Sequence, residues 1–292
     1  MAEPSDAPAE STASGAPVEA KSGSRAGRNL PMAIAVGVGL GAISLLSLFT
    51  YKWLFGVVAM AAICIGIWEL TKALALNGIQ VARTPLYLGA VAVIPMAYNF
   101  GLIGLLMVYG LIVISAMIWR IRRGVDGYVK DLTATVFVAS YLPFMLGFVA
   151  LMLAQPLGPQ LIVVFVSLTI CNDIGGYAAG VLFGKHPIAA NVSPKKSWEG
   201  FAGSVLLQVV VGAWLFVWLL HAPWWQGVIA GVVMSVTATA GDFAESAIKR
   251  DLGVKDLGNI LPGHGGLMDR LDSLLPNAFV SWLLFSIFAI IT

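Results

Sequence analysis

Long runs of apolar residues, almost free of charge, dominate the 292-residue sequence and strongly restrict its possible folds. A run of about 20 such residues is long enough to cross the ~30 Å hydrocarbon core of a bilayer as a helix. Only 11% of the residues are charged, whereas a soluble globular protein has about 25%. The alternating segments of ~10 residues that a transmembrane β-barrel requires are absent. The sequence therefore predicts an all-α, polytopic integral membrane protein.

About nine of these runs are expected to span the membrane. The third contains Pro95 and is short, and a very tight loop joins it to the fourth. The predicted spans are 30–50, 54–76, 85–98, 101–119, 132–153, 160–181, 200–220, 225–245 and 274–291.

Basic residues fall almost entirely on one side of this predicted topology. If the N-terminus is cytoplasmic, sixteen of the 17 lysines and arginines face the cytoplasm and only Lys52 faces the other side. Because cytoplasmic loops carry the excess of Lys and Arg in membrane proteins, the split supports both this orientation and an odd number of spans. The protein is expected to be a multi-pass protein of the cell (inner or plasma) membrane.

Three regions are expected along the chain. Residues 1–28 lack apolar periodicity and resemble a disordered cytoplasmic tail rather than a secretory signal. Residues 29–155 hold the N-terminal transmembrane helices, and residues 156–292 form the C-terminal catalytic transmembrane region. Cys64 and Cys171 lie inside apolar runs, where they are expected to be small core residues.

Asp173 is an acidic residue inside a predicted span. An unpaired carboxylate at such a depth costs about 2.5–3.5 kcal/mol. The side chain is therefore expected to face a cavity, an ion or a partner. A buried hydrogen bond or salt bridge to a neighbouring helix is the simpler alternative.

The polar segment 184–200 offers groups that suit phosphate oxygens. Lys185 and Lys196 supply positive charge, and Ser193 and Ser197 supply hydroxyl groups close to a helix start. The alternative is an ordinary cytoplasmic loop whose positive charge contacts anionic lipid head groups.

Two pairs of acidic residues follow near the cytoplasmic ends of the last helices. Asp242 and Glu245 are three residues apart, as are Asp269 and Asp272, so each pair shares one helical face. Hard oxygen ligands without clustered His or Cys suit Mg²⁺, which usually binds through one or two carboxylates plus substrate phosphates. The glycines at 263–266 would let the backbone approach a ligand. Solvated helix ends and a Gly-rich turn are the alternatives.

These features predict carboxylates that hold a divalent metal beside cations that hold phosphate, all at the cytoplasmic face of the membrane. The chemistry is then metal-dependent phosphate chemistry on a membrane-embedded substrate. Kinase, phosphatase, nucleotidyltransferase and phosphotransferase reactions all remain open at this level.

The segment 246–272 resembles the signature of the phosphatidate cytidylyltransferases, also called CDP-diacylglycerol synthases. That signature reads S-x-x-K-R, four residues, K-D, and then P-x-H-G-G-x-x-D-R-x-D, and each fixed position is present. "GDFAES" and "SPKKSWEG" are similar to two further motifs of the family. The sequence departs from the family at Ile174 and Gly176, where a Ser and an Ala often follow the intramembrane Asp.

This resemblance implies transfer of the cytidylyl group of CTP to phosphatidate, giving CDP-diacylglycerol and pyrophosphate, with Mg²⁺ and room for a second cation. Asp242 and Asp269 are the implied metal ligands, with Asp173 and Asp272 as second candidates. The implied catalytic residues are Asp173, Asp242, Lys249, Arg250, His264, Asp269 and Arg270. The implied substrate-binding residues are Lys185, Ser193, Lys196, Ser197, Glu245, Lys255, Asp256, Gly265 and Gly266.

Two other functions are compatible with parts of the sequence. A CTP-dependent polyprenol or phytol kinase resembles this family in its C-terminal region and would release CDP instead of pyrophosphate. A transporter or membrane scaffold would use Asp173 for ion coupling and would not turn over CTP. Membrane lipid is an expected partner, nucleic acid is not, and a homodimer is compatible with the sequence.

Overall fold

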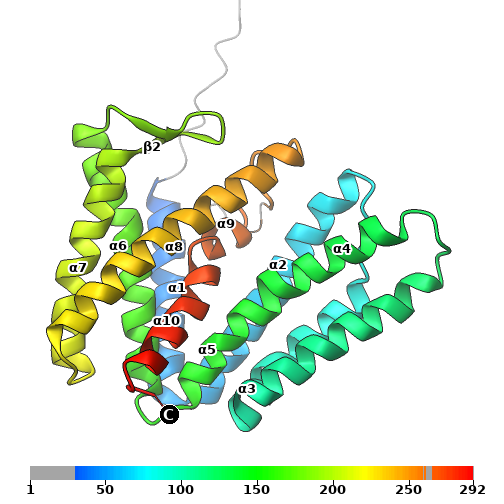
Figure 1. Cartoon of the computed structure of the whole chain (residues 1–292), viewed down its shortest axis with the longest axis horizontal. Helices are drawn as coiled ribbons and strands as arrows, with labels where there is room; N and C mark the ends of the chain where they lie inside the picture. The colour runs from blue at the N-terminus through cyan, green and yellow to red at the C-terminus, as the bar shows by residue number, and fades with distance from the viewer. Residues whose placement is uncertain (1–29, 259, 261–264, 292) are drawn as a thin grey trace, which may run out of the picture.

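The computed structural model describes residues 30–258, 260 and 265–291, and almost all of its regular structure is helical (Figure 1). The tail at 1–28 and His264 therefore lie outside the described residues. The elements are α1 (Leu30–Thr50), α2 (Lys52–Leu76), α3 (Arg83–Ile121), α4 (Tyr128–Ala139), the π-helix η1 (Ser140–Phe144), α5 (Met145–Ala154), α6 (Gly158–Phe183), β1 (Pro187–Ala189), β2 (Ser193–Ser197), α7 (Trp198–Leu219), α8 (Trp224–Asp251), α9 (Met268–Leu271) and α10 (Leu274–Ile287).

Six helices of the described chain are long and apolar enough to cross a membrane. One of the six is the continuous run α4–η1–α5, residues 128–154. Pro143 lies in η1, and because proline has no N–H to donate, the hydrogen-bond ladder shifts there to the wider π spacing. The prediction of an all-helical membrane protein is confirmed. It missed one small feature, an antiparallel hairpin of β1 and β2 in the polar segment 184–200.

Helix α3 reverses direction at Gly101, which has φ +62° and ψ −149° and so lies outside helical geometry. The two halves pack against each other on either side of this point. A Cβ at Gly104 would lie 2.2 Å from the carbonyl oxygen of Met96, and a Cβ at Gly89 would lie 2.2 Å from the Ile112 side chain. Segments 83–100 and 102–121 thus form a helical hairpin, as the two predicted spans and their very tight loop indicate.

Helices α6, α7 and α8 approach one another closely because glycines line their contacts. A Cβ at Gly175 would lie 2.5 Å from the carbonyl oxygen of Gly203, and one at Gly227 would lie 2.2 Å from that of Gly212. In a membrane, where lipid is as apolar as the helix surface, such close backbone packing is a principal source of helix association. It holds the three helices that carry most of the polar side chains of the site.

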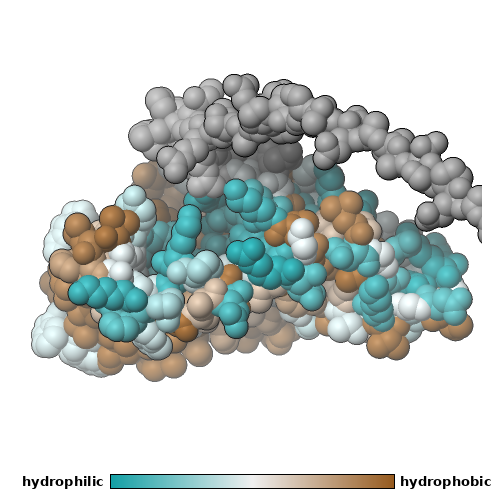
Figure 2. Space-filling view, turned by 90° about the horizontal axis from the view of Figure 1, so that it is seen from above, coloured by the Kyte–Doolittle hydropathy of each residue, from teal (hydrophilic) through white to brown (hydrophobic). Residues whose placement is uncertain are grey.

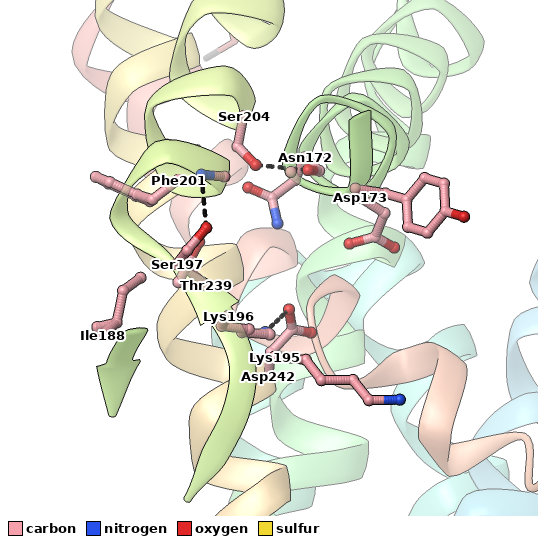
Figure 3. A pocket seen from close by; sticks show the side chains of 13 residues that line it. Asn172, Asp173, Ile188, Lys195, Lys196, Ser197, Phe201, Ser204, Thr239 and Asp242 are labelled. Carbon is pink, nitrogen blue, oxygen red and sulfur yellow. Dashed lines mark hydrogen bonds and ion pairs between the residues drawn. The ribbon is translucent and has the colours of Figure 1, made fainter. Parts of the chain in front are cut away.

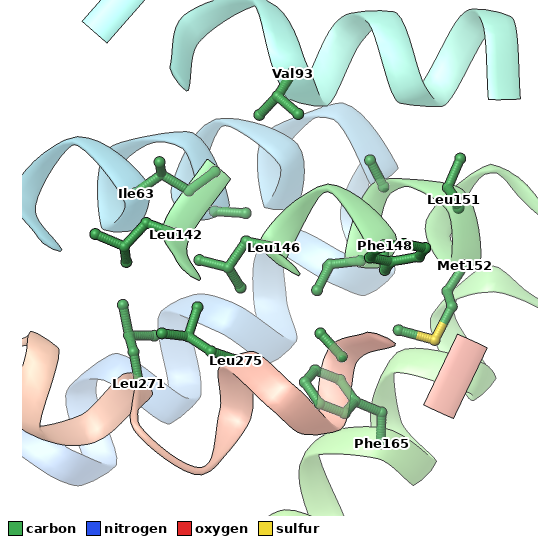
Figure 4. Packing of buried hydrophobic residues seen from close by; sticks show 14 of the residues in the cluster. Ile63, Val93, Leu142, Leu146, Phe148, Leu151, Met152, Phe165, Leu271 and Leu275 are labelled. Carbon is green, nitrogen blue, oxygen red and sulfur yellow. The ribbon is translucent and has the colours of Figure 1, made fainter. Parts of the chain in front are cut away.

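An apolar core joins these helices to the N-terminal half (Figure 4). Ile63 of α2, Leu142 of η1 and Leu275 of α10 are completely buried, and Leu271 at the end of α9 is nearly so. Dense packing leaves such side chains little freedom to shift. The short α9, which carries Asp269, is therefore fixed against α2 and η1.

The polar loops of the described chain meet at one end of the helices. The Asn77 side chain donates to the Leu252 carbonyl at 3.1 Å, and Lys130 donates to the Asn77 carbonyl at 3.4 Å. Lys52 lies at the other end, where it donates to the Gln155 carbonyl at 2.7 Å. The face seen in Figure 2 carries many hydrophilic residues among hydrophobic ones.

Candidate active site

A pocket of about 210 Å³ opens between α6, β2, α7 and α8 at this polar end (Figure 3). Asp173 of α6, Lys196 of β2 and Asp242 of α8 line it, together with Asn172 and Thr239. The Asp242 carboxylate forms a salt bridge with Lys196 and accepts a hydrogen bond from the Ser273 hydroxyl. Residues that are far apart in the sequence therefore converge on one carboxylate.

The hairpin and the start of α7 explain how Lys196 reaches this pocket. Ser197 caps α7, since its hydroxyl oxygen accepts from the Gly200 N–H at 3.1 Å. Strand β2 thus runs directly into the helix. Side chains alternate along a strand, so Lys196 is half-buried against Asp242, while its neighbour Lys195 is exposed.

A second group of charges lies next to the first. Glu245, completely buried, and Asp269 both pair with Lys249, whose Nζ lies 2.9 Å from Glu245 Oε2 and 2.9 Å from Asp269 Oδ1. The other Asp269 oxygen accepts from the Gly266 N–H at 2.8 Å. Both oxygens of Asp269 are therefore held in place, one by an ammonium group and one by backbone.

Asp272 connects the two groups. It lies within hydrogen-bonding reach of Asp242 and Glu245, and its Oδ1 accepts from the Ser273 N–H at 2.7 Å. Burial, together with the negative charges of Asp242 and Glu245, raises the pKa of Asp272 to about 10. The carboxyl is therefore protonated at neutral pH.

A separate pocket of about 230 Å³ beside the acidic cluster is lined by positive charge and hydroxyl groups. Several cations facing one small volume suit a polyanion such as a chain of phosphates. Its polar side chains come from the hairpin, from the end of α8 and from the segment after it: Ser193, Lys195, Ser246, Lys249, Arg250 and Lys255. Lys195 lines both pockets.

The acidic cluster fits a divalent cation by its charge. Five carboxyl groups and three cations lie in this region, and with Asp272 protonated one negative charge is in excess: Asp173, Asp242, Glu245, Asp269 and Asp272 against Lys196, Lys249 and Arg270. Oε1 of the buried Glu245 has no hydrogen-bond partner among the described residues. Within the same residues, no three acidic, His or Cys side chains converge as a preformed metal centre. Mg²⁺ needs only one or two carboxylates when phosphates complete its coordination.

The structure brings most of the predicted site residues together. Asp173, Lys196, Ser197 and Asp242 line the first pocket, and the second contains Ser193, Lys249, Arg250 and Lys255. Gly265 lies beside both Asp256 and Asp269. Lys185 lines neither pocket, and its backbone N–H donates to the Glu199 carboxylate at 3.1 Å.

Four residues of the site region were not predicted. Asn172, Thr239 and Ser273 are uncharged and gave no signal in the sequence. Glu69 did give a signal in the sequence, because it is an acidic residue in a long apolar run, as Asp173 is. It is completely buried, and its Oε2 accepts from the Met268 N–H at 2.8 Å, beside Asp269.

Comparison with known proteins agrees with this arrangement. The model of the cytidylyltransferase family matches residues 32–288. The phosphatidate cytidylyltransferase of Mycobacterium bovis is 37% identical over 96% of both chains, and that of Mycobacterium leprae is 38% identical over 88% of both. A phosphatidate cytidylyltransferase of Staphylococcus epidermidis is 42% identical over 105 residues, which are 36% of this chain and 40% of its own. The match extends over nearly the whole sequence, and the chain therefore belongs to the cytidylyltransferase family.

Proposed function

We propose that the protein transfers the cytidylyl group of CTP to phosphatidate, producing CDP-diacylglycerol and pyrophosphate for phospholipid synthesis. The nucleotidyltransferase class predicted from the 246–272 motif is confirmed by the family match. The mycobacterial relatives, which are similar along almost their full length, are phosphatidate cytidylyltransferases. One structural observation carries the proposal: a cation-lined pocket and an acid-lined pocket share the side chain of Lys195.

The two pockets suit the two substrates. The triphosphate of CTP occupies the pocket of Ser193, Lys249, Arg250 and Lys255, where positive charge neutralises the phosphates. The phosphate of phosphatidate enters the pocket of Asp173, Lys196 and Asp242, whose α6 wall exposes apolar residues such as Ile174 to the lipid. The α-phosphorus of CTP then lies between the pockets, close to Lys195.

The reaction forms one P–O bond and breaks another. An oxygen of the phosphatidate phosphate attacks the α-phosphorus of CTP, and the bond to the β-phosphate breaks to release pyrophosphate. Phosphatidate is already anionic at neutral pH, so no general base is required. Lys249, Arg250 and Lys255 neutralise the leaving pyrophosphate, and Lys196 neutralises the attacking phosphate. Catalysis thus consists of positioning and electrostatic stabilisation.

Mg²⁺ is the proposed cation, held by Asp242 and Asp269 with Asp173 and Asp272 as further ligands. Bound there, it would screen the repulsion between the two anionic substrates and favour departure of the pyrophosphate. Lys196 and Lys249 pair with these carboxylates. The ion pairs hold the acids in place.

We also propose nine spans, with the N-terminus and the site on the cytoplasmic side. The six long helices become nine when α1, α10 and both halves of α3 are counted. The cations of the described loops then face the cytoplasm, as is usual for membrane proteins, and the site faces the compartment that contains CTP.

One acyl chain of phosphatidate binds in an apolar cavity of about 330 Å³ between α1, α2, α5 and α6. Leu271 and Leu274 line the cavity and flank Asp272 and Ser273 in the sequence. Ile170, three residues before Asp173, also lines it. A chain seated there would keep its phosphate beside the acidic cluster.

Labelled CTP separates this function from its nearest rival, a CTP-dependent lipid kinase. The purified protein is incubated in detergent with phosphatidate or, in a parallel reaction, with a polyprenol, each with and without Mg²⁺. Label in the α-phosphate should enter the lipid, while label in the γ-phosphate should appear in pyrophosphate. Transfer of γ-label to a lipid alcohol would support the kinase, and no turnover of CTP would contradict both.

A further inference from the structure

We infer that Glu69, on α2 in the N-terminal half of the chain, is a positioning residue that holds the segment carrying Asp269 in its active geometry. This inference rests on the proposed function, because Asp269 matters through the cation and the substrates. Glu69 belongs to neither pocket. It would act only through the backbone at Gly258, Gly266 and Met268.

The burial of Glu69 requires an explanation. The residue is completely buried, within a helix long and apolar enough to cross the membrane. A carboxylate in such surroundings is costly unless hydrogen bonds or charges compensate it. Its known contact is the backbone N–H of Met268, 2.8 Å from Oε2. A backbone donor at the start of α9 therefore compensates part of that cost.

Two glycines make room for the carboxylate on either side of that segment. A Cβ at Gly258 would lie 2.0 Å from Glu69 Oε1, and a Cβ at Gly266 would lie 2.7 Å from Oε2. Both distances are far below van der Waals contact. The backbone at 258 and at 266 is thus built closely around one carboxylate, so Glu69 fixes the position of both glycines.

The chain of contacts continues directly to Asp269. Gly266, which lies against Glu69, donates its N–H to Asp269 Oδ2 at 2.8 Å. One turn earlier on α2, a Cβ at Gly66 would lie 3.7 Å from Leu271, just after Asp269. Helix α2 therefore contacts α9 at two successive levels, one polar and one apolar. A displacement of Glu69 would move the Asp269 carboxylate rather than a distant loop.

The test compares Glu69→Ala with Glu69→Gln and with a buried carboxylate elsewhere. Asp131 is a matched control: it is also buried, accepts a backbone N–H from Gln80 at 2.8 Å and pairs with Arg120 away from the site. Glu69→Ala should lower kcat roughly 10- to 100-fold, since misplacement by about 1 Å can cost 10²-fold. Half-saturation by Mg²⁺ should shift to higher concentration, while KM for CTP changes little.

Glu69→Gln keeps an oxygen that can accept from Met268 and should restore much of the activity. Asp131→Ala should lower the melting temperature as much as Glu69→Ala does, yet leave half-saturation by Mg²⁺ unchanged. Gly258→Ala should reproduce the Glu69→Ala phenotype because its Cβ displaces the carboxylate. Gly110→Ala, where a Cβ meets nothing within 4 Å, is its control.

Binding of Mn²⁺ to the detergent-solubilised protein, followed by electron paramagnetic resonance without CTP, provides a readout independent of turnover. Glu69→Ala should weaken Mn²⁺ binding at least several-fold. Equal effects of Glu69→Ala and Asp131→Ala at equal loss of stability would overturn the inference, as would Mg²⁺ dependence within twofold of wild type. A wild-type protein that binds Mn²⁺ but forms no CDP-diacylglycerol would contradict the proposed function instead.

Discussion

Replacement of Asp269 by Asn tests the role of the acidic cluster most directly. Asp269 accepts from Lys249 at 2.9 Å and from the Gly266 N–H at 2.8 Å. Asn is almost the same size but has only one acceptor oxygen. Its NH₂ group must therefore face one of the two groups that donate to the carboxylate, the Lys249 ammonium or the Gly266 N–H. Loss of one hydrogen bond to a charged group costs about 1.5–3 kcal/mol. This is less than the ~5–15 kcal/mol stability of a typical protein, so the variant should still fold.

Turnover should fall much further than stability. Removal of one group that stabilises charge in a transition state typically lowers kcat about 10²- to 10³-fold. The assay measures CDP-diacylglycerol formed from radiolabelled CTP and phosphatidate across a Mg²⁺ titration, with the melting temperature recorded in the same detergent. Asp251→Asn, an exposed acid at the end of α8, is the control and should behave as wild type. Unchanged kinetics of Asp269→Asn at saturating Mg²⁺ would refute the assignment of Asp269 as a metal ligand.

Two further predictions follow from burial. The raised pKa of Asp272, about 10, means that the folded protein binds a proton that the unfolded chain releases near pH 4. The metal-free protein should therefore lose stability as pH rises from 6 to 9, and a flat melting temperature would contradict this. Ala62→Trp, which fills the apolar cavity, should lower kcat/KM for long-chain phosphatidate roughly tenfold by displacing the head group. The same variant should react normally with short-chain phosphatidate. The control Ala92→Trp, in a groove on α3, should react normally with both substrates. Equal losses for both chain lengths in Ala62→Trp would argue against the cavity as the acyl-chain site.

Much of the fold followed from hydropathy alone, because each long apolar run must be a helix in lipid. The very tight loop expected between the runs 85–98 and 101–119 also falls where α3 is interrupted, at Gly101. The hairpin of β1 and β2 was not predicted. Segment 184–200 is polar and short, and its strands depend on the Ser197 cap and on Glu199 binding the backbone at Lys185 and His186.

The site was predictable where its residues are charged and close in sequence. Asp242, Glu245 and Lys249 lie close together on one helix, and Glu245 pairs with Lys249 four residues later. Glu69 was missed because its contact with Met268 joins residues 199 positions apart. No local pattern reports such a contact. The N-terminal helices therefore contribute to the site in a way that the clustering of acids in the last third of the sequence did not show.

Lys249 has two roles that conflict, and the conflict predicts how the substrates and the cation assemble. It lines the proposed triphosphate pocket, yet it also neutralises Glu245 and Asp269. An ammonium 2.9 Å from a metal ligand repels a divalent cation by several kcal/mol, even at an effective dielectric constant of about 20. Arrival of the triphosphate would draw the Lys249 charge away and expose Asp269.

The same reasoning gives an unusual expectation for Lys249→Met. Turnover should collapse, because a triphosphate contact is lost, while Mn²⁺ binding without CTP should tighten at least tenfold, because the competing charge is gone. Electron paramagnetic resonance measures that affinity directly, and chelation by CTP does not enter. Weaker Mn²⁺ binding in this variant would mean that Lys249 shapes the cation site rather than competing for it. Tighter binding would mean that Lys249 competes with the cation, so a triphosphate that draws Lys249 away raises the affinity for Mg²⁺, and Mg²⁺ raises that for CTP by the same factor.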